Sequence, residues 1–210
     1  MSISNYSNEF KKFLNRKYFS NNLHQYRKDA FIEFEKIGFP NQKWEDWQFT
    51  NLSEISKGKF RISESKDVPQ SNIDLNIYNI DGLNTIVIFN GHYQKHLSTI
   101  PDGVLILNGN EYLDKNNGSL ELVNSSPFDL LNTAFVDSGI NIIIEKNTHI
   151  DIPIRILFIA NGKDAIMVNP RVYIKMEESS SLIFVEHHVG DTKSFFQNES
   201  LFISAKNNAK

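Results

Sequence analysis

The sequence predicts an α+β protein that is mainly β, in which a helical N-terminal region precedes a β-rich core. Apolar residues recur at helical spacing over residues 1–38, whereas short segments rich in β-branched residues follow Gly139 without a helical pattern between them. With 210 residues, of which 40% are hydrophobic, the chain can bury a substantial core. We place a boundary at residue 80: residues 1–80 form the helical region with a connecting segment, and residues 81–210 form the β core.

Two amphipathic helices are predicted at the N-terminus. The first carries an apolar stripe that includes Phe10 and Leu14. The second begins at the amide caps Asn21 or Asn22 and ends at Gly38, because glycine tolerates the left-handed conformation that closes a helix.

A connecting segment and a hairpin follow. Residues 53–80 are polar and interrupted by glycine and proline, so we expect a loosely structured connection. Residues 85–89 are β-branched and aromatic, and Asn90 with Gly91 suits a type I′ turn, which requires positive φ at both positions. The return strand is expected from His92 onward.

The rest of the chain is predicted to be strands, apart from one short helix. Ser126 caps that helix and Pro127 takes its first position, where the missing N–H costs nothing. Its buried face comprises Phe128, Leu131, Ala134 and Phe135. Strands are expected at 103–107, 140–144, 154–160, 172–176, 182–186 and 201–204.

Two architectures fit these strands. A sandwich is possible, but several strands are apolar without strict alternation and recur at uneven intervals. A parallel β-helix fits at least as well, because each coil stacks on the next and fills a continuous interior. An unfinished stack would leave an open edge of unpaired backbone groups at its end.

Composition excludes several functional classes. The net charge is −3 without a long basic run, which argues against nucleic-acid binding. The longest apolar runs fall far short of the ~20 residues that span a bilayer, and residues 1–15 lack a secretory apolar stretch. We therefore expect a cytoplasmic protein without a membrane partner. The absence of cysteine removes disulfides, thiolate metal sites and thiol nucleophiles, so thiolate ligands for any iron–sulfur cluster would come from another chain.

The histidines are weak candidates for metal binding. His92 and His96 are expected on a strand, where residues four apart lie ~13 Å from each other, too far for one ion. Glu186 and His188 can share one face of a strand, and Asp191 follows in a turn, whereas His187 points to the opposite face. We favour a charged pair on the outer face of a coil over a metal site.

No catalytic motif is visible. Trp44 and Trp47 flank Glu45 and Asp46, and we expect the rings to pin this segment to a helix or partner while both carboxylates stay solvated. Gly162 and Lys163 superficially match a phosphate-binding loop. However, Leu157 and Asp164 occupy positions that require Gly and Ser or Thr, so no ATP hydrolysis is expected.

Three ordered motifs resemble the SufB/SufD family of iron–sulfur cluster assembly proteins. Residues 38–52, GFPNQKWEDWQFTNL, are similar to a signature near the N-terminus of the SufD branch. Residues 131–135 with Gly139 and 153–158 resemble the entry into the family's core. The third motif comprises NPRV at 169–172, SLIFVEHH at 181–188, FFQN at 195–198 and Asn208 with Ala209.

The resemblance implies a right-handed parallel β-helix preceded by a helical region, and a non-catalytic scaffold. Family members pair with a SufB-like paralogue and bind the SufC-like ATPase. The cluster is then transient on the assembled complex, ATP binds the partner ATPase, and this chain alone binds no cofactor. Family members continue past the position of Lys210 into further coils and a helical region that docks the ATPase. The resemblance therefore covers an N-terminal portion, and no active-site residue is transferred to this chain.

Other functions remain open at this point. The chain is alternatively a stand-alone adaptor that binds a SufB-like partner without the ATPase, or a non-functional fragment. An enzyme of the polysaccharide-cleaving β-helix type is disfavoured, because no cluster of Asp, Arg or Lys recurs across successive segments.

Overall fold

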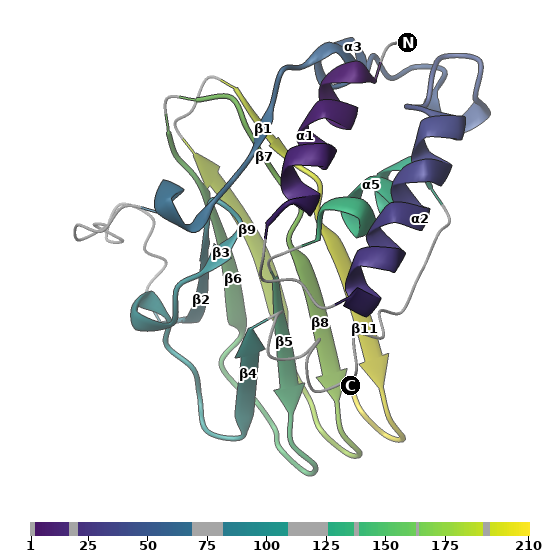
Figure 1. Ribbon diagram of the computed structural model, residues 1–210. Coiled ribbons are helices and arrows are strands. Elements are labelled where there is room, and N and C mark those ends of the chain that lie inside the picture. The colour runs from purple at the N-terminus through teal and green to yellow at the C-terminus, as the bar shows by residue number, and fades with distance from the viewer. Residues whose placement is uncertain are drawn as a thin grey trace.

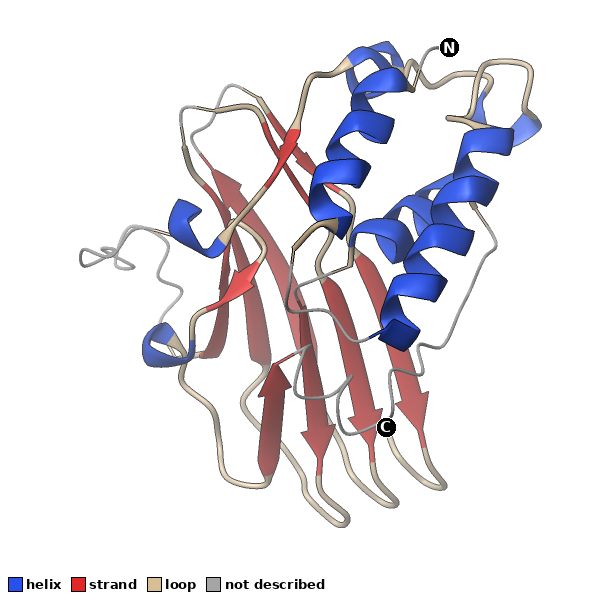
Figure 2. Ribbon diagram, viewed as in Figure 1, coloured by secondary structure: helices blue, strands red, loops and turns tan. Residues whose placement is uncertain are grey.

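The computed structural model of the chain describes residues 3–16, 21–68, 82–108, 126–136, 139–162, 164–190 and 194–210. A small group of helices lies beside several sheets, which confirms the predicted α+β class (Figures 1 and 2). The α-helices gather on one side of the strands, whereas the short 3-10 helices of residues 65–67 and 95–97 lie at the left of Figure 2. The helices are α1 Ser4–Leu14, α2 Asn21–Ile37, α3 Ser53–Lys57 and α5 Pro127–Phe135, and the short 3-10 helices are η1 Glu45–Trp47, η2 Ser65–Asp67 and η4 Lys95–Leu97.

Both N-terminal helices and their stop signal agree with the prediction. The helix α2 begins at Asn21 and ends at Ile37, and Gly38 has a φ of 71° in the left-handed region. The helix α5 begins as expected, because the Ser126 hydroxyl accepts a hydrogen bond from the Asp129 backbone N–H at 3.1 Å. Its last turns are buried through Leu131 and the residues that follow.

The predicted hairpin is confirmed as well. The strands β2 Asn84–Phe89 and β3 His92–Tyr93 pair antiparallel, and Phe89 faces His92 across the turn. Asn90 has a φ of 46° and Gly91 a φ of 85°, so both turn residues adopt the positive φ that a type I′ turn needs.

The strands form three sheets. Their orders are β3-β2-β6-β9 in sheet I, β1-β7-β10 in sheet II and β11-β8-β5-β4 in sheet III. All neighbours are parallel except the pairs β2–β3 and β4–β5. The remaining strands are β1 Arg61–Ile62, β4 Val104–Asn108, β5 Gly139–Ile144, β6 Ile154–Ala160, β7 Ile166–Val168, β8 Arg171–Met176, β9 Phe184–Gly190, β10 Phe195–Gln197 and β11 Ser200–Ala205.

The chain visits the three sheets twice in the same order. The middle coil consists of β6, β7 and β8, and the last coil consists of β9, β10 and β11. Each strand of the last coil pairs in parallel with its counterpart in the middle coil, so the two coils stack (Figure 1). On the other side of the middle coil lie β2, β1 and β5, one in each sheet.

Several details of the strand prediction were wrong. The strands β7 and β10 were not predicted, because three residues are too few to show a periodic pattern. The strand β9 runs to Gly190 rather than ending at Glu186. The stretch 53–68, expected to be loosely structured, contains α3, β1 and η2, and β1 adds a strand to sheet II. The rest of that predicted connection lies outside the described residues.

Two apolar cores hold this arrangement. One fills the interior of the coils between sheets I and III, with fully buried residues such as Ile156 and Ile174. The other joins the helices to the outer face of sheet II, where Phe10 and Phe34 pack in the same cluster as Met167. The division at residue 80 and the right-handed parallel β-helix stay predictions.

Candidate functional site at the open end of the stack

In sheet I, two interior-facing positions are apolar in the middle coil and polar in the last coil. In register, Ile156 of β6 is followed by Glu186 of β9, and Phe158 is followed by His188. Ile156 and Phe158 belong to the buried interior core. Because register partners on parallel strands share one face of a sheet, Glu186 and His188 occupy inward positions of the last coil.

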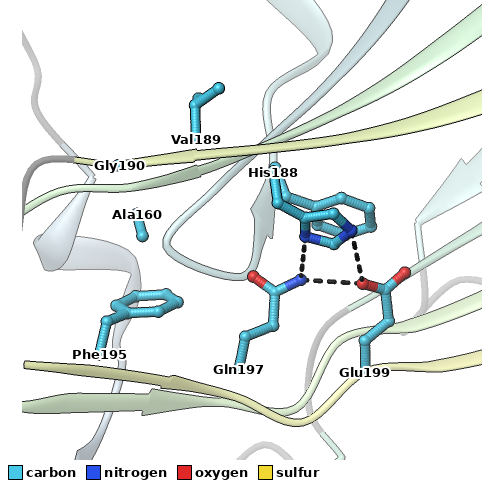
Figure 3. Close-up of a pocket in the computed structure, with 8 residues that line it drawn as sticks. Ala160, His188, Val189, Gly190, Phe195, Gln197 and Glu199 are labelled. Carbon is cyan, nitrogen blue, oxygen red and sulfur yellow. Dashed lines mark hydrogen bonds and ion pairs between the residues drawn. The ribbon is translucent and has the colours of Figure 1, made fainter.

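His188 is held by an aromatic stack and a side-chain amide. Its ring lies parallel to the Phe158 ring, with centroids 4.7 Å apart and an interplanar angle of 3°. The Gln197 amide donates to His188 Nδ1 at 3.2 Å and to Glu199 Oε2 at 2.8 Å (Figure 3). The Nδ1 atom is thus the acceptor, and the Nε2 atom faces Glu199 Oε2 at 3.9 Å.

Glu199 is a buried acid. Its side chain is 13% exposed, and its Oε1 atom receives no hydrogen bond from an N–H or hydroxyl donor. Burial first, and then the negative charge of Glu186, raise the pKa of Glu199 to about 8. At neutral pH, Glu199 therefore retains its proton.

These residues border a pocket of about 440 Å³. Figure 3 shows that the polar groups of His188, Gln197 and Glu199 converge on one side of it. The pocket opens at the end of the coil interior, because its walls come from β6, β9, β10 and the residue before β11. The lining residues are Phe158, Ala160, His188, Val189, Gly190, Phe195, Gln197 and Glu199.

The same end of the stack carries three free strand edges. The strands β9, β10 and β11 each stand last in their sheet, so within the described residues each pairs on one side only. Ile203 of β11 follows the buried Ile174 in register, yet its side chain is 55% exposed. We call this surface the open end. It is apolar along sheet III and polar where β9 meets β10.

The structure corrects the expected placement of the histidines. Glu186 and His188 were expected on the outer face of a coil, but they face inward, because the Phe158 side chain that stacks on His188 belongs to the interior core. His96 does not share a strand with His92, since the chain leaves β3 after Tyr93 and His96 lies in η4.

Few side chains are available as ligands for the metal site considered from the sequence. Among the described residues, no group of three His, Cys, Asp or Glu side chains is arranged to hold a metal ion. Asp191, the third residue considered, lies outside the described residues, as does Lys163. Glu186 and His188 as metal ligands stay a prediction. Sequence reasoning missed Gln197 and Glu199, because only the register of β9 against β10 and β11 brings them to His188.

The tryptophan segment is partly as expected. The Trp47 ring packs against the Phe128 ring of α5, with centroids 5.3 Å apart, while Glu45 and Asp46 are exposed. Trp44 is more exposed than Trp47, and its expected contact with a helix or partner stays a prediction.

Comparison with protein families identifies the chain. A sequence model described as SufBD protein N-terminal region matches residues 3–156, which run from α1 into β6. The chain belongs to this family. Membership links it to iron–sulfur cluster assembly. No curated protein matches the chain significantly.

The SufB/SufD motifs contribute to two places: Phe158, His188, Phe195 and Gln197 line the pocket, and other motif residues form a buried polar network. The Asn132 amide of α5 donates to the backbone carbonyl of Asn198 at 2.7 Å and to that of Pro170 at 3.2 Å. Arg171 Nε donates to Asn132 Oδ1 at 2.9 Å, and its Nη2 donates to the Thr133 hydroxyl at 2.8 Å. The network fixes α5 to both coils at the corner between sheets II and III.

An asparagine stack completes the network. Asn198 Nδ2 donates to Asn169 Oδ1 at 3.1 Å and to the Phe128 carbonyl at 2.9 Å. The two asparagines occupy the same corner of successive coils, so the Asn198 amide satisfies the side-chain oxygen of Asn169. No described helix of this SufB/SufD chain is both long and apolar enough to cross a bilayer.

Proposed function

We propose that the chain is a non-catalytic, SufD-type scaffold subunit of a cytoplasmic iron–sulfur cluster assembly complex. The family match supports the pathway, and the resemblance of residues 38–52 to the SufD signature supports this branch. The repeated order of the three sheets supports coils of a right-handed parallel β-helix as the scaffold.

The main support for the scaffold role is that residues of the family motifs form buried hydrogen bonds. Asn132, Arg171 and Asn198 are buried, and each donates a hydrogen bond to a neighbouring side chain or backbone carbonyl. Residues committed to such a network stabilise the fold and are not available to a substrate. The motifs thereby support a chain whose task is to present a shaped surface.

The partners follow from the family and from the composition. A SufB-like paralogue and a SufC-like ATPase are the proposed partners, with ATP on the ATPase and a transient cluster on the complex. The chain has no cysteine, and cysteine thiolates are the usual cluster ligands. We therefore propose that the paralogue supplies the thiolates.

Co-expression with the SufB-like and SufC-like proteins of the same organism tests this function. We expect the chain to co-purify with both, and the complex to gain iron and sulfide relative to a preparation that lacks the chain. Arg171→Ala should reduce assembly by opening the network, whereas Lys175→Ala, an exposed change on the same strand, should not. Equal iron and sulfide with and without the chain would exclude the proposal.

The second candidate function is a stand-alone adaptor that binds a SufB-like protein without the ATPase. An adaptor would bind the SufB-like protein equally well with and without the ATPase. Omitting the SufC-like protein from the same co-purification therefore separates the two functions.

A further inference from the structure

The segment that connects α2 to α3 contains a hollow of about 560 Å³, which shares no lining residue with the pocket of Figure 3. Residues 40–43 and 50–52 line the hollow, and residues 44–49 form the tip of the segment between them. Two lining residues, Pro40 and Leu52, are apolar and buried. The others are polar, and none of them is acidic: Asn41, Gln42, Lys43, Thr50 and Asn51.

Consecutive turns fix the shape of this segment. The backbone N–H of Trp44 donates to the Asn41 carbonyl at 2.9 Å, and that of Trp47 donates to the Trp44 carbonyl at 2.9 Å. The backbone N–H of Thr50 donates in turn to the Trp47 carbonyl at 3.0 Å. The Trp47 ring also packs on Phe128 of α5, which ties the tip to the helices. The hollow is therefore preformed, so little conformational entropy is lost when a ligand binds.

The polar groups of the hollow are mainly hydrogen-bond donors. Asn41 Oδ1 accepts from the Lys43 backbone N–H at 2.9 Å, and Asn51 Oδ1 accepts from the Ser53 backbone N–H at 3.0 Å. Both side-chain amides thus have their Nδ2 donors left, and no described residue accepts from them. The Lys43 ammonium adds a cation that has no ion pair among the described residues. Such a set of donors complements an acceptor-only anion, either a carboxylate or a phosphate.

The tip of the segment favours a carboxylate carried by a protein over a free anion. Phe49 is 92% exposed, the highest value among the large apolar side chains of the described residues, and Trp44 is 36% exposed. A small anion would leave the Phe49 ring in water, whereas a polypeptide can bury it. Glu45 and Asp46 are exposed on η1 and outnumber Lys43, so the segment has no net positive charge to attract free phosphate.

We propose that residues 40–52 dock a partner protein that inserts an aspartate or glutamate side chain into the hollow and packs an adjacent apolar side chain on Phe49. Lys43 and the amides of Asn41 and Asn51 hold the carboxylate, and the Phe49 ring supplies the apolar contact. The occupant is thus an acidic residue with an apolar neighbour on the surface of the partner. This inference goes beyond the proposed function, because it assigns a binding role to a surface outside the buried motif network.

Two capped peptides test the proposal by NMR spectroscopy with the full chain. The acidic peptide is Ala-Phe-Glu-Leu-Ala, and the neutral peptide has glutamine in place of glutamate. Both should shift the backbone signal of Phe49, and the acidic peptide should also shift the side-chain amide signals of Asn41 and Asn51. Titration is expected to give at least about fivefold tighter binding for the acidic peptide, because hydrogen bonds to a charged group are stronger than those to an amide.

Variants assign the two contacts to their side chains. Lys43→Gln should make the two peptides bind equally, and Phe49→Ser should weaken both peptides by a similar factor. The matched control is Lys57→Gln, because Lys57 is an exposed lysine of α3 outside the hollow, so the preference should persist. All three changes affect exposed side chains, so the fold should persist as well, which circular dichroism checks.

Several results would overturn the proposal. Equal binding of both peptides to the unaltered chain, or no binding at millimolar concentration, would exclude a carboxylate site. Inorganic phosphate that shifts the same amide signals and displaces the acidic peptide would identify a site for free anions. A dimer that is detected by light scattering and lost in Phe49→Ser would identify a second copy as the occupant. None of these readouts involves iron or sulfide, so failure here is distinct from failure of the cluster assembly function.

Discussion

The middle coil and the last coil share a backbone path but differ in what fills them. Inward positions of β6 carry Ile156 and Phe158, whereas the same positions of β9 carry Glu186 and His188. Both coils keep the same register, because each strand of the last coil pairs in parallel with its counterpart in the middle coil. The comparison shows that one backbone path accepts either apolar or polar side chains at these inward positions.

The largest expected difference between the coils concerns the free energy of unfolding. Ile156→Ala should lower it by about 2–5 kcal/mol, because a fully buried side chain leaves a cavity that the packed interior cannot close. Glu186→Ala, at the next inward position in register, should change it by less than about 0.5 kcal/mol. Urea denaturation of both variants measures this, and equal losses would contradict the comparison.

The corner network should give a smaller but clear effect. Arg171→Ala removes the donors to Asn132 Oδ1 and to the Thr133 hydroxyl in a buried site, so we expect a loss of roughly 1–3 kcal/mol. Thermal unfolding followed by circular dichroism measures the loss, with Lys175→Ala as the exposed control on β8. A loss no larger than that of the control would show that the network does not tie α5 to the coils.

The third expected effect, similar in size to that of the corner network, is a pH dependence that originates in the last coil. Folding raises the pKa of Glu199 to about 8, so the folded state holds a proton that the unfolded chain releases near pH 4.3. This contribution to stability is complete at low pH and is lost as the pH rises through 8. Between pH 5 and pH 8.5 we expect a fall of roughly 1–3 kcal/mol in unfolding free energy.

Substitution of Glu199 tests whether this carboxyl group causes the pH dependence of the unfolding free energy. Glu199→Gln keeps the size of the side chain and removes its titration, so the variant should show a flatter profile between pH 5 and pH 8.5. Glu178→Gln should leave the slope as it is, because Glu178 is half-exposed and ion-paired in a turn. An unchanged slope in the Glu199 variant would mean that another group releases the proton.

Sequence alone predicts the elements whose signal is local. The cap at Ser126, the turn at Asn90 and the stop at Gly38 each depend on one or two residues with restricted conformations, and all three are confirmed. The longer apolar strands also carry enough residues to be recognised. The family motifs were also found in the sequence, although the role of their residues in the buried hydrogen-bond network was not predicted.

The candidate site depended on long-range register, which no local pattern encodes. Glu186 and His188 were selected for sharing a strand face, but the face could not be assigned without knowing that β6 lies beside β9. Glu199 was not selected from the sequence, because its raised pKa results from burial and from the charge of Glu186 on another strand. Strands of three residues, such as β7, were not predicted from the sequence, because they are defined by pairing with neighbouring strands and not by composition.

The phenylalanine-rich helices have a consequence during synthesis. The cluster that buries Phe10 and Phe34 also contains Met167 and Phe196, which lie in the late strands β7 and β10. At typical translation rates the ribosome needs roughly 10–30 s to make the intervening chain. Throughout that interval part of the surface that covers α1 and α2 in the finished fold is missing, so the nascent chain is a candidate client for chaperones that bind aromatic-rich segments.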